Sequence, residues 1–494
     1  MKRVTIDPIS RLEGHGKIEI FLNDEGNVEN AYLQIPELRG FEQFAIGRQA
    51  EDLPVITQRI CGVCPEAHHM ASAKALDGVF GVEPTSAAKK IRELLYSAFF
   101  VTDHTTHFYA LGGPDFIVGP EAPPLERNIL GVIHKVGVDI GKQVIECRKR
   151  NHNVIKMLGG RSIHPTGGVP GGWSKSLSEE NRVEVEKIAK ANIEFAQFSL
   201  KAFDDIVLKN SDYLNLVTSD IYHHETYYMG MVDENNQINF YDGLIRVVDP
   251  TGKEFVKYDA KDYRDHIAER VESWTYLKFP YLKNVGWKGF EDGIDSGVYC
   301  ATPLSRLNCS DGLPTPKATE HYEQMYETFG CKKVNGRYQP IHFRLATHWA
   351  RLIELLYSSE RMLELATDPE ITSKDVRVIP TKIIGEGIGC VEAPRGTLTH
   401  HYKTDENGII TMANLIVGTT NNYAPMSMSI KRAAEKLITK GKVNEGMLNK
   451  VEMAFRLYDP CLSCATHNLP GKMPLQIVVK NMNGEHLDTI RRVC

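Results

Sequence analysis

The chain has 494 residues, of which 42 % are hydrophobic and 24 % charged, and a formal net charge of −5 at pH 7. This balance is typical of soluble globular proteins and argues against disordered and fibrous classes. There is no basic run, no signal-peptide pattern and no apolar segment of membrane-spanning length, so we expect a cytoplasmic protein with no membrane span and no nucleic-acid partner.

The first predicted element is a β-hairpin. The segments "KIEIFL" and "VENAYLQI" alternate apolar and polar residues on either side of "NDEGN", which has the composition of a turn. Next comes "RICGVCPEAHH", residues 59–69, with two cysteines three positions apart. A proline and a run of good helix formers after the second cysteine predict a helix that begins there.

Three later segments, residues 87–111, 181–210 and 342–365, have apolar residues at helical spacing. Between and after them, residues 244–258 and 397–417 each alternate around a turn and predict β-hairpins. Long helices with wide apolar faces are typical of bundles.

We therefore predict an α+β fold that is predominantly helical, with a central bundle of long helices and small peripheral β-sheets. We find no internal repeat and no flexible linker. Residues 1–467 are accordingly predicted to form a single intertwined unit.

A second cysteine pair lies in "DPCLSCATH", residues 459–467, and repeats the C-x-x-C spacing of the first pair. Four thiolates suit zinc, an iron–sulfur cluster or another soft metal centre. Structural zinc sites usually take both pairs from a short stretch, whereas closing a loop of nearly the whole chain costs about 5 kcal/mol. Spacing alone leaves a structural zinc site and a catalytic centre open. The six other cysteines are expected in the core or the tail.

The residues around both pairs carry a more specific pattern. The first pair matches R-x-C-G-x-C-x-x-x-H and the second matches D-P-C-x-x-C-x-x-H. Both patterns resemble the signatures of the large, catalytic subunit of nickel-iron hydrogenases. Four further segments match that family in the same order: "RLEGH" at 11–15, "RGFE" at 39–42, "HFYALGGPDF" at 107–116 and "APRG" at 393–396. The resemblance implies reversible heterolytic cleavage of H2 into protons and electrons.

The resemblance also implies the ligands of the metal centre. Cys61 and Cys461 correspond to the cysteines that bind nickel terminally, and Cys64 and Cys464 to those that bridge nickel to iron. In the family the iron carries carbon monoxide and cyanide. No further iron–sulfur signature occurs, so we expect no iron–sulfur cluster in this chain.

Two polar groups match the family's catalytic residues. Glu13 corresponds to the carboxylate that hydrogen-bonds a terminal cysteine and starts a proton path, although from the residue alone it could be a capping or salt-bridging glutamate. Arg395 corresponds to the arginine over the open coordination position, held by Asp115 and Asp459, with Pro394 shaping the pocket. From the residues alone, this group could equally be a structural ion network.

Other matches surround the centre. Glu42 and His467 correspond to the pair that binds magnesium or a similar hard ion, and His68 is expected to be an outer partner of a bridging thiolate. Thr419 is assigned to the pocket of the cyanide ligands. Here the sequence departs from the family, because "VGTTNN" at 417–422 replaces the usual V-P-(S/T)-T-W-N.

The family also implies processing and partners. A maturation endopeptidase would cut after His467 and remove residues 468–494, which could alternatively form an ordinary terminal hairpin. Electrons would leave through an iron–sulfur small subunit, then through nicotinamide- and flavin-dependent, deazaflavin-dependent or heterodisulfide reductase modules. The alternatives kept open are a complex I-like relative without metal chemistry and a structural four-cysteine metal protein.

Overall fold

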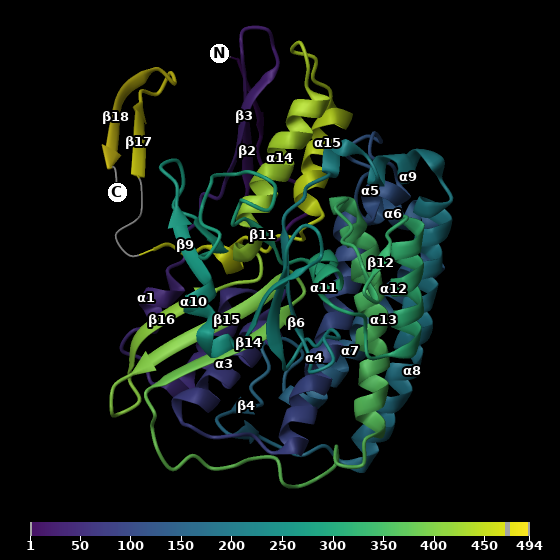
Figure 1. Ribbon diagram of the computed structural model, residues 1–494, viewed down its shortest axis with the longest axis vertical. Coiled ribbons are helices and arrows are strands. Elements are labelled where there is room, and N and C mark those ends of the chain that lie inside the picture. The colour runs from purple at the N-terminus through teal and green to yellow at the C-terminus, as the bar shows by residue number, and fades with distance from the viewer. Residues whose placement is uncertain (1, 470–474, 493–494) are drawn as a thin grey trace.

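A computed structural model describes residues 2–469 and 475–492 of the chain. Its largest feature is a bundle of four long helices, α4 (Ser86–Thr106), α7 (Val138–Gly159), α8 (Glu179–Phe203) and α13 (Thr347–Thr367) (Figure 1). Helix α13 packs against both α4 and α8, and α7 packs against α4. The predicted helical centre is therefore confirmed.

Two of the predicted long helices end earlier than their apolar spacing indicated. After Thr106 the chain continues as a π-helical turn, His107–Gly112, and after Phe203 as another, Asp204–Leu208. A π-helical turn holds an extra residue and rotates the side chains that follow, and such turns are frequent at functional sites. The first of them leads directly into α5 (Pro114–Ile117).

The remaining helices are shorter or lie outside the bundle. They are α1 (Phe41–Ala45), α2 (Leu53–Thr57), α3 (Pro65–Val79), α6 (Ile129–Val136), α9 (Ser211–Val217), α10 (Tyr263–His266), α11 (Pro303–Cys309), α12 (Pro316–Thr328), α14 (Tyr423–Leu437) and α15 (Glu445–Arg456). Helix α3 begins directly after the first cysteine pair, as predicted.

Small sheets surround the bundle, and the three predicted hairpins are all present. The larger sheets have the strand orders β1-β2-β3, β14-β15-β16 and β11-β6-β7-β8, antiparallel except for the β11–β6 pair. Their strands are β1 (Lys2–Ile6), β2 (Lys17–Leu22), β3 (Val28–Gln34), β6 (Tyr227–Val232), β7 (Leu244–Val248), β8 (Glu254–Tyr258), β11 (Tyr299–Cys300), β14 (Glu386–Ala393), β15 (Gly396–Thr404) and β16 (Ile410–Ile416). Two-stranded pairs are formed by β4 (Gly168–Val169) with β5 (Gly172–Trp173), β9 (Ile267–Val271) with β10 (Lys278–Leu282), and β12 (Lys333–Val334) with β13 (Arg337–Tyr338).

Helix α3 lies directly on the sheet of β14 and β15. The approach is so close that a Cβ atom on Gly387 would lie 2.0 Å from the carbonyl oxygen of Ala75, and one on Gly389 would lie 2.0 Å from that of Ala71. Only glycine fits at these two positions of β14. The contact aligns the β14–β15 hairpin with the helix that follows the first cysteine pair.

One large hydrophobic core runs through the bundle and includes both cysteine pairs. The single cysteines expected in the core lie there or nearby: Cys147, Cys300, Cys309 and Cys390 are buried and Cys331 is half-buried, whereas Cys494 lies outside the described residues. Among the described helices, none is long and apolar enough to span a bilayer.

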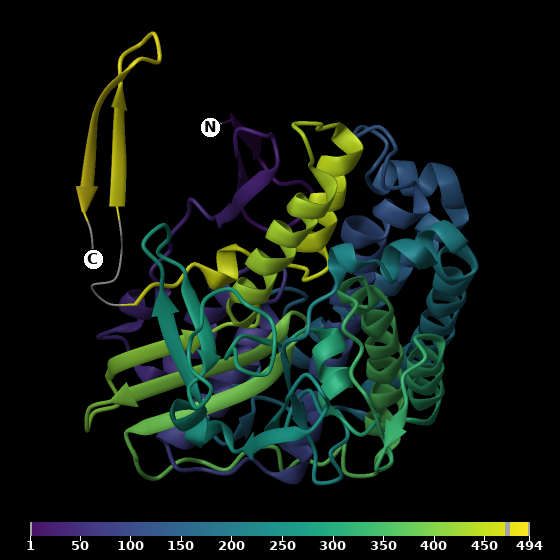
Figure 2. The same ribbon diagram turned by 45° about the horizontal axis from the view of Figure 1, so that its top comes forward.

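The C-terminal segment forms a hairpin of β17 (Leu475–Lys480) and β18 (His486–Arg492). Both views place this hairpin apart from the rest of the chain, at the upper left (Figures 1 and 2). Several apolar side chains of this hairpin face solvent, among them Leu487, 62 % exposed, and Ile490, 54 % exposed.

Candidate metal centre

The fold brings the two cysteine pairs together in the core. Cys64 is the N-cap residue of α3, and Cys464 lies in the short turn Ser463–Ala465 that follows α15. The sulfurs of Cys61 and Cys461 are 3.2 Å apart, as are those of Cys64 and Cys464. All four sulfurs lie within 4.8 Å of one another, and all are buried free thiols. Residues from both ends of the chain therefore form one site for a soft metal.

The protonation of these thiols is strongly coupled. Hydrogen bonds from Cys461 and its neighbours hold the pKa of Cys61 well below the usual thiol value. Burial raises the pKa of Cys461 and Cys464 well above it. Four adjacent buried thiolates repel one another, so they are all ionised only when a positive centre lies among them.

Glu13 lies beside the second pair. Its Oε2 atom is 3.0 Å from the Cys461 sulfur and accepts a hydrogen bond from the backbone N–H of Ser463 at 3.1 Å. The backbone of Glu13 also pairs in parallel with Cys461 and accepts the N–H of Leu462. Both contacts fix the carboxylate against the thiol, as the sequence resemblance had indicated.

Arg395 occupies the two-residue turn between β14 and β15 and lines the same small cavity as three of the four cysteines. Its Nη1 atom lies 3.0 Å from Asp103 Oδ2, and its Nη2 atom lies 3.2 Å from Asp459 Oδ2. Burial disfavours the charge, yet the two carboxylates raise the pKa of Arg395 well above its usual value. The guanidinium therefore stays positively charged inside the core.

The expected pairing of Asp115 with Arg395 is wrong. Asp115 pairs with Arg11 at 2.5 Å and with Arg456 at 2.7 Å. Asp103, in the last turn of α4, is the carboxylate that meets Arg395, whereas Asp115 lies beyond the π-helical turn, in α5. Asp115 thus belongs to a separate buried ion network.

A small cavity adjoins the sulfurs of Cys64, Cys461 and Cys464, and Arg395 and Thr419 also line it. The Thr419 hydroxyl accepts a hydrogen bond from the Cys461 backbone N–H at 3.1 Å. Pro394, which was expected to shape this pocket, precedes Arg395 in the turn but is not among the described residues that line the cavity. A closed four-cysteine zinc site leaves no open coordination position, so an adjoining cavity with a charged wall favours a catalytic centre.

His68 also lines the cavity, and another histidine lies within hydrogen-bond distance of its ring. Its Nδ1 atom lies 3.1 Å from His400 Nε2, and its Nε2 atom has no partner within the described ranges. Burial lowers the pKa of His68 to about 4, so its ring is neutral at pH 7. The structure therefore gives it no hydrogen bond to a bridging thiolate.

Glu42 and His467 lie side by side near the second pair. The Nε2–H group of His467 donates to the Cys464 carbonyl at 2.8 Å, and its Nδ1 atom lies 3.8 Å from Glu42 Oε2. That Nδ1 atom is buried and has no hydrogen-bond partner in the described part of the chain. The other carboxylate oxygen, Oε1, accepts from the Lys278 ammonium at 3.0 Å and from the Leu415 N–H at 2.8 Å.

Sequence reasoning missed three charged residues near the centre: Asp103, Lys278 and Arg306. Asp103 and Lys278 each interrupt an apolar run, "SAFFVTDH" and "YLKFPYL", and a charge in such a run signals a buried ion pair. Arg306 has no comparable signal in the sequence.

Comparison with known proteins supports one assignment. A family model described as nickel-dependent hydrogenase matches residues 39–124 and 302–467, and one described as HoxL-like matches residues 3–38. These ranges include Glu13 and all four cysteines. The chain belongs to the nickel-dependent hydrogenase family.

This hydrogenase is similar to curated and solved proteins along nearly its whole length. An iron-sulfur subunit of the F420-non-reducing hydrogenase of Archaeoglobus profundus is 51 % identical and matches over 99 % of this chain and 100 % of that protein. The NAD-reducing hydrogenase HoxS subunit beta of Cupriavidus necator is 38 % identical over 99 % of both chains. An NAD+-reducing [NiFe]-hydrogenase in the H2-reduced state superimposes with a TM-score of 0.86, at 35 % identity over 94 % of this chain and 100 % of that chain.

The family and the four-cysteine site together establish the activity. This chain is the large, catalytic subunit of a nickel-iron hydrogenase, which converts H2 reversibly into protons and electrons. The complex I-like and structural-metal alternatives are thereby set aside.

Proposed function

We propose that Glu13 and Arg395, which both lie close to the cysteine cluster, carry the proton chemistry of this hydrogenase. The observation that carries the proposal is the 3.0 Å contact between Glu13 Oε2 and the Cys461 sulfur. When bound, the nickel-iron centre, with carbon monoxide and cyanide on its iron, supplies the redox chemistry that splits hydrogen. The four buried thiols and the adjoining cavity fit such a centre.

Glu13 receives a proton from the Cys461 sulfur and passes it outward. The Ser463 N–H holds the same Oε2 atom that contacts the thiol, so the carboxylate cannot rotate away from it. A positioned carboxylate of this kind lowers a proton-transfer barrier because no rearrangement precedes the transfer.

Arg395 presents a fixed positive charge to the cavity. The two carboxylates that hold it, Asp103 and Asp459, occupy its terminal nitrogens, while its Nε atom has no partner in the described structure. A preorganised cation in a water-poor site polarises a small molecule far more than the same group does in water.

Glu42 and His467 are proposed to hold a magnesium ion or a similar hard cation. Among the described residues, the Nδ1 atom of His467 has no hydrogen-bond partner, and it lies 3.8 Å from Glu42 Oε2. Both atoms carry a lone pair, so a cation between them could bind to both. Lys278 neutralises the other carboxylate oxygen. Thr419 is proposed to face the cyanide ligands, as its side chain borders the cavity.

The partners are also proposals. The names of the relatives in Archaeoglobus profundus and Cupriavidus necator describe subunits of hydrogenase complexes, and we expect an iron–sulfur small subunit to take the electrons from this chain. The high similarity to an F420-non-reducing protein favours an acceptor other than F420. A maturation endopeptidase is proposed to cut after His467 and release residues 468–494. The cytoplasmic location stays a prediction.

The deciding experiment is an infrared spectrum of the purified complex, combined with its metal content. Bands of metal-bound carbon monoxide and cyanide, with one nickel per chain, are the expected result. Zinc in place of nickel, and no such bands in protein cut after His467, would refute the proposed centre.

A further inference from the structure

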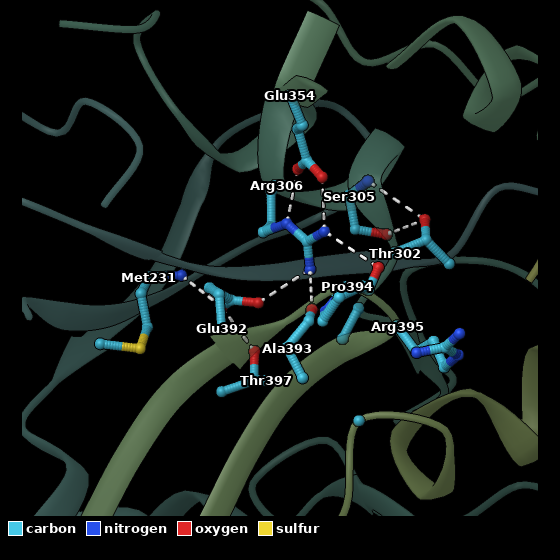
Figure 3. Close-up of polar contacts among 12 residues, drawn as sticks. Met231, Thr302, Ser305, Arg306, Glu354, Glu392, Ala393, Pro394, Arg395 and Thr397 are labelled. Carbon is cyan, nitrogen blue, oxygen red and sulfur yellow. Dashed lines mark hydrogen bonds and ion pairs between the residues drawn. The ribbon is translucent and has the colours of Figure 1, made fainter. Parts of the chain in front are cut away.

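A second buried arginine, Arg306 on α11, lies next to the turn that carries Arg395 (Figure 3). Its guanidinium has five N–H donors, and all five find acceptors. Nε and Nη2 donate to the two oxygens of Glu354 at 2.6 and 2.7 Å. Nη1 donates to Glu392 Oε2 at 3.0 Å and to the Ala393 carbonyl at 2.9 Å, and Nη2 also donates to the Pro394 carbonyl at 3.2 Å.

Both carboxylates that bind Arg306 are themselves fixed. Glu354 Oε2 accepts from His104 Nε2 at 2.9 Å. Glu392 Oε1 accepts from the Met231 N–H and the Thr397 hydroxyl, each at 2.8 Å. Arg306 is thus held rigidly to α13 through Glu354 and to β14 through Glu392.

The turn between β14 and β15 is held through three consecutive backbone carbonyls, those of Ala393, Pro394 and Arg395. Ala393 and Gly396 are paired, so Pro394 and Arg395 form a two-residue turn. Arg306 binds the first two carbonyls of the stretch, and the amide of Asn422 donates to the Arg395 carbonyl at 2.7 Å.

At Gly396, which follows the turn, the backbone of Ala301 and Gly418 packs closely against the chain. A Cβ atom on Gly396 would lie 2.4 Å from the Ala301 carbonyl oxygen and 2.7 Å from that of Gly418. Figure 3 shows the Arg395 guanidinium pointing away from Arg306, so the two arginines lie on opposite sides of the same turn.

We propose that Arg306 is a positioning residue for Arg395: by holding the Ala393 and Pro394 carbonyls, it sets where the Arg395 guanidinium stands beside the cavity. The inference rests on the proposed role of Arg395. Lysine cannot replace Arg306, because an ammonium has three donors and no planar fork. In Arg306→Lys the turn loses at least one of its contacts and Arg395 shifts.

A double-mutant cycle tests this in the assembled holoenzyme, using Arg306→Lys, Arg395→Lys and the double variant. We expect Arg306→Lys to keep nickel and iron while H2 oxidation falls about 10- to 100-fold, the loss typical of a misplacement of about 1 Å. Because Arg306 acts through Arg395, it should cost little further activity in the Arg395→Lys background. The infrared bands of the iron ligands should shift in Arg306→Lys, since the charge beside the cavity has moved.

Arg92→Lys is the matched control. Arg92 is equally buried, pairs with Asp77 and binds the Val169 and Gly172 carbonyls, but holds a different turn. It should leave the infrared bands unchanged.

Two outcomes distinguish a failure of the positioning role of Arg306 from a failure of the proposed role of Arg395. Additive losses in the cycle would mean that Arg306 acts independently of Arg395 and would overturn the inference alone. Full activity in Arg395→Lys would instead refute the proposed role of Arg395. If Arg306→Lys does not fold, Glu392→Gln replaces it in the cycle. That variant weakens one contact of Arg306, and a smaller loss with the same non-additivity is expected.

Discussion

Glu13 and Cys461 are in contact across 448 positions of sequence, with the carboxylate 3.0 Å from the sulfur. A parallel backbone bridge joins the same two residues. The proposed proton acceptor is therefore fixed to the ligand loop by main chain as well as by its side chain.

Replacing Glu13 with Gln keeps the shape and removes the titratable group. We expect the turnover of H2 oxidation to fall about 100-fold or more, the usual contribution of a positioned acid or base, while nickel content stays constant. Glu452→Gln is the control, because this carboxylate binds Ser10, only three positions before Glu13 in the chain, and is not at the cluster. Full turnover in a nickel-loaded Glu13→Gln enzyme would exclude Glu13 as the proton exit.

The two carboxylates Asp103 and Asp115 should behave differently. Asp103→Asn removes one of the two negative charges that hold the Arg395 guanidinium, and the turnover of H2 oxidation should fall about tenfold. Asp115→Asn removes the buried carboxylate that Arg11 and Arg456 share, although Arg456 keeps its pair with Glu452, and should lower the free energy of unfolding by about 3 kcal/mol. Measuring turnover and thermal unfolding on both variants distinguishes a carboxylate that holds Arg395 from one that stabilises the fold. A turnover defect confined to Asp115→Asn would restore the original assignment.

Buried neutral histidines should make the protein sensitive to acid. Burial lowers the pKa of His348 to about 3 from its usual 6.5. Below about pH 6.5 the unfolded chain binds a proton that the folded chain does not, so stability is complete above that pH and is lost as pH falls toward 3.

The effect can be measured as melting temperature against pH between 6.5 and 4. His348→Gln should show a shallower fall than the wild-type chain, because one proton fewer is bound on unfolding, at about 1.4 kcal/mol per pH unit for each proton. Parallel curves would show that His348 does not contribute.

Glu42 offers a test of the proposed hard-ion site. Elemental analysis of the mature complex should find about one magnesium or equivalent ion per chain, and Glu42→Gln should lose it. Glu269→Gln is a useful comparison, since Glu269 contacts Lys278 as Glu42 does. An unchanged ion content in Glu42→Gln would show that the ion binds elsewhere.

The exposed C-terminal hairpin, β17 and β18, should be dispensable for stability. A chain ending at His467 is expected to melt within about 2 °C of the full-length chain, since surface changes away from packed contacts have small effects. Intact mass should show that the nickel-containing chain ends at His467. Nickel-loaded chains that retain residues 468–494 would mean that processing does not follow the family pattern.

Local patterns in the sequence predicted those parts of the molecule that depend on them. Apolar spacing located the long helices, alternation located the hairpins, and the family motifs identified Glu13 and the four cysteines as neighbours. The same approach paired Asp115 with Arg395, because a motif records order along the chain and not the direction of a side chain. Asp103, which meets Arg395, lies before the π-helical turn at His107–Gly112, and Asp115 lies after it, paired with Arg11 and Arg456.

Arg306 escaped prediction for a different reason. Its partners Glu354 and Glu392 lie 48 and 86 positions away, and nothing in their spacing indicates that three charges share one buried site. Contacts of that kind depend on how α11, α13 and β14 pack, which no single segment specifies.

The position of the cysteines along the chain also sets an order of events in the cell. The second pair is among the last described core residues to leave the ribosome, and it must meet a pair made 400 residues earlier. A growing chain therefore has no complete binding site until Cys464 has been made, and nickel can be enclosed by all four thiols only after that. Once bound, the metal would close a ring of about 400 residues between the two pairs, so its loss would release both pairs from each other at once.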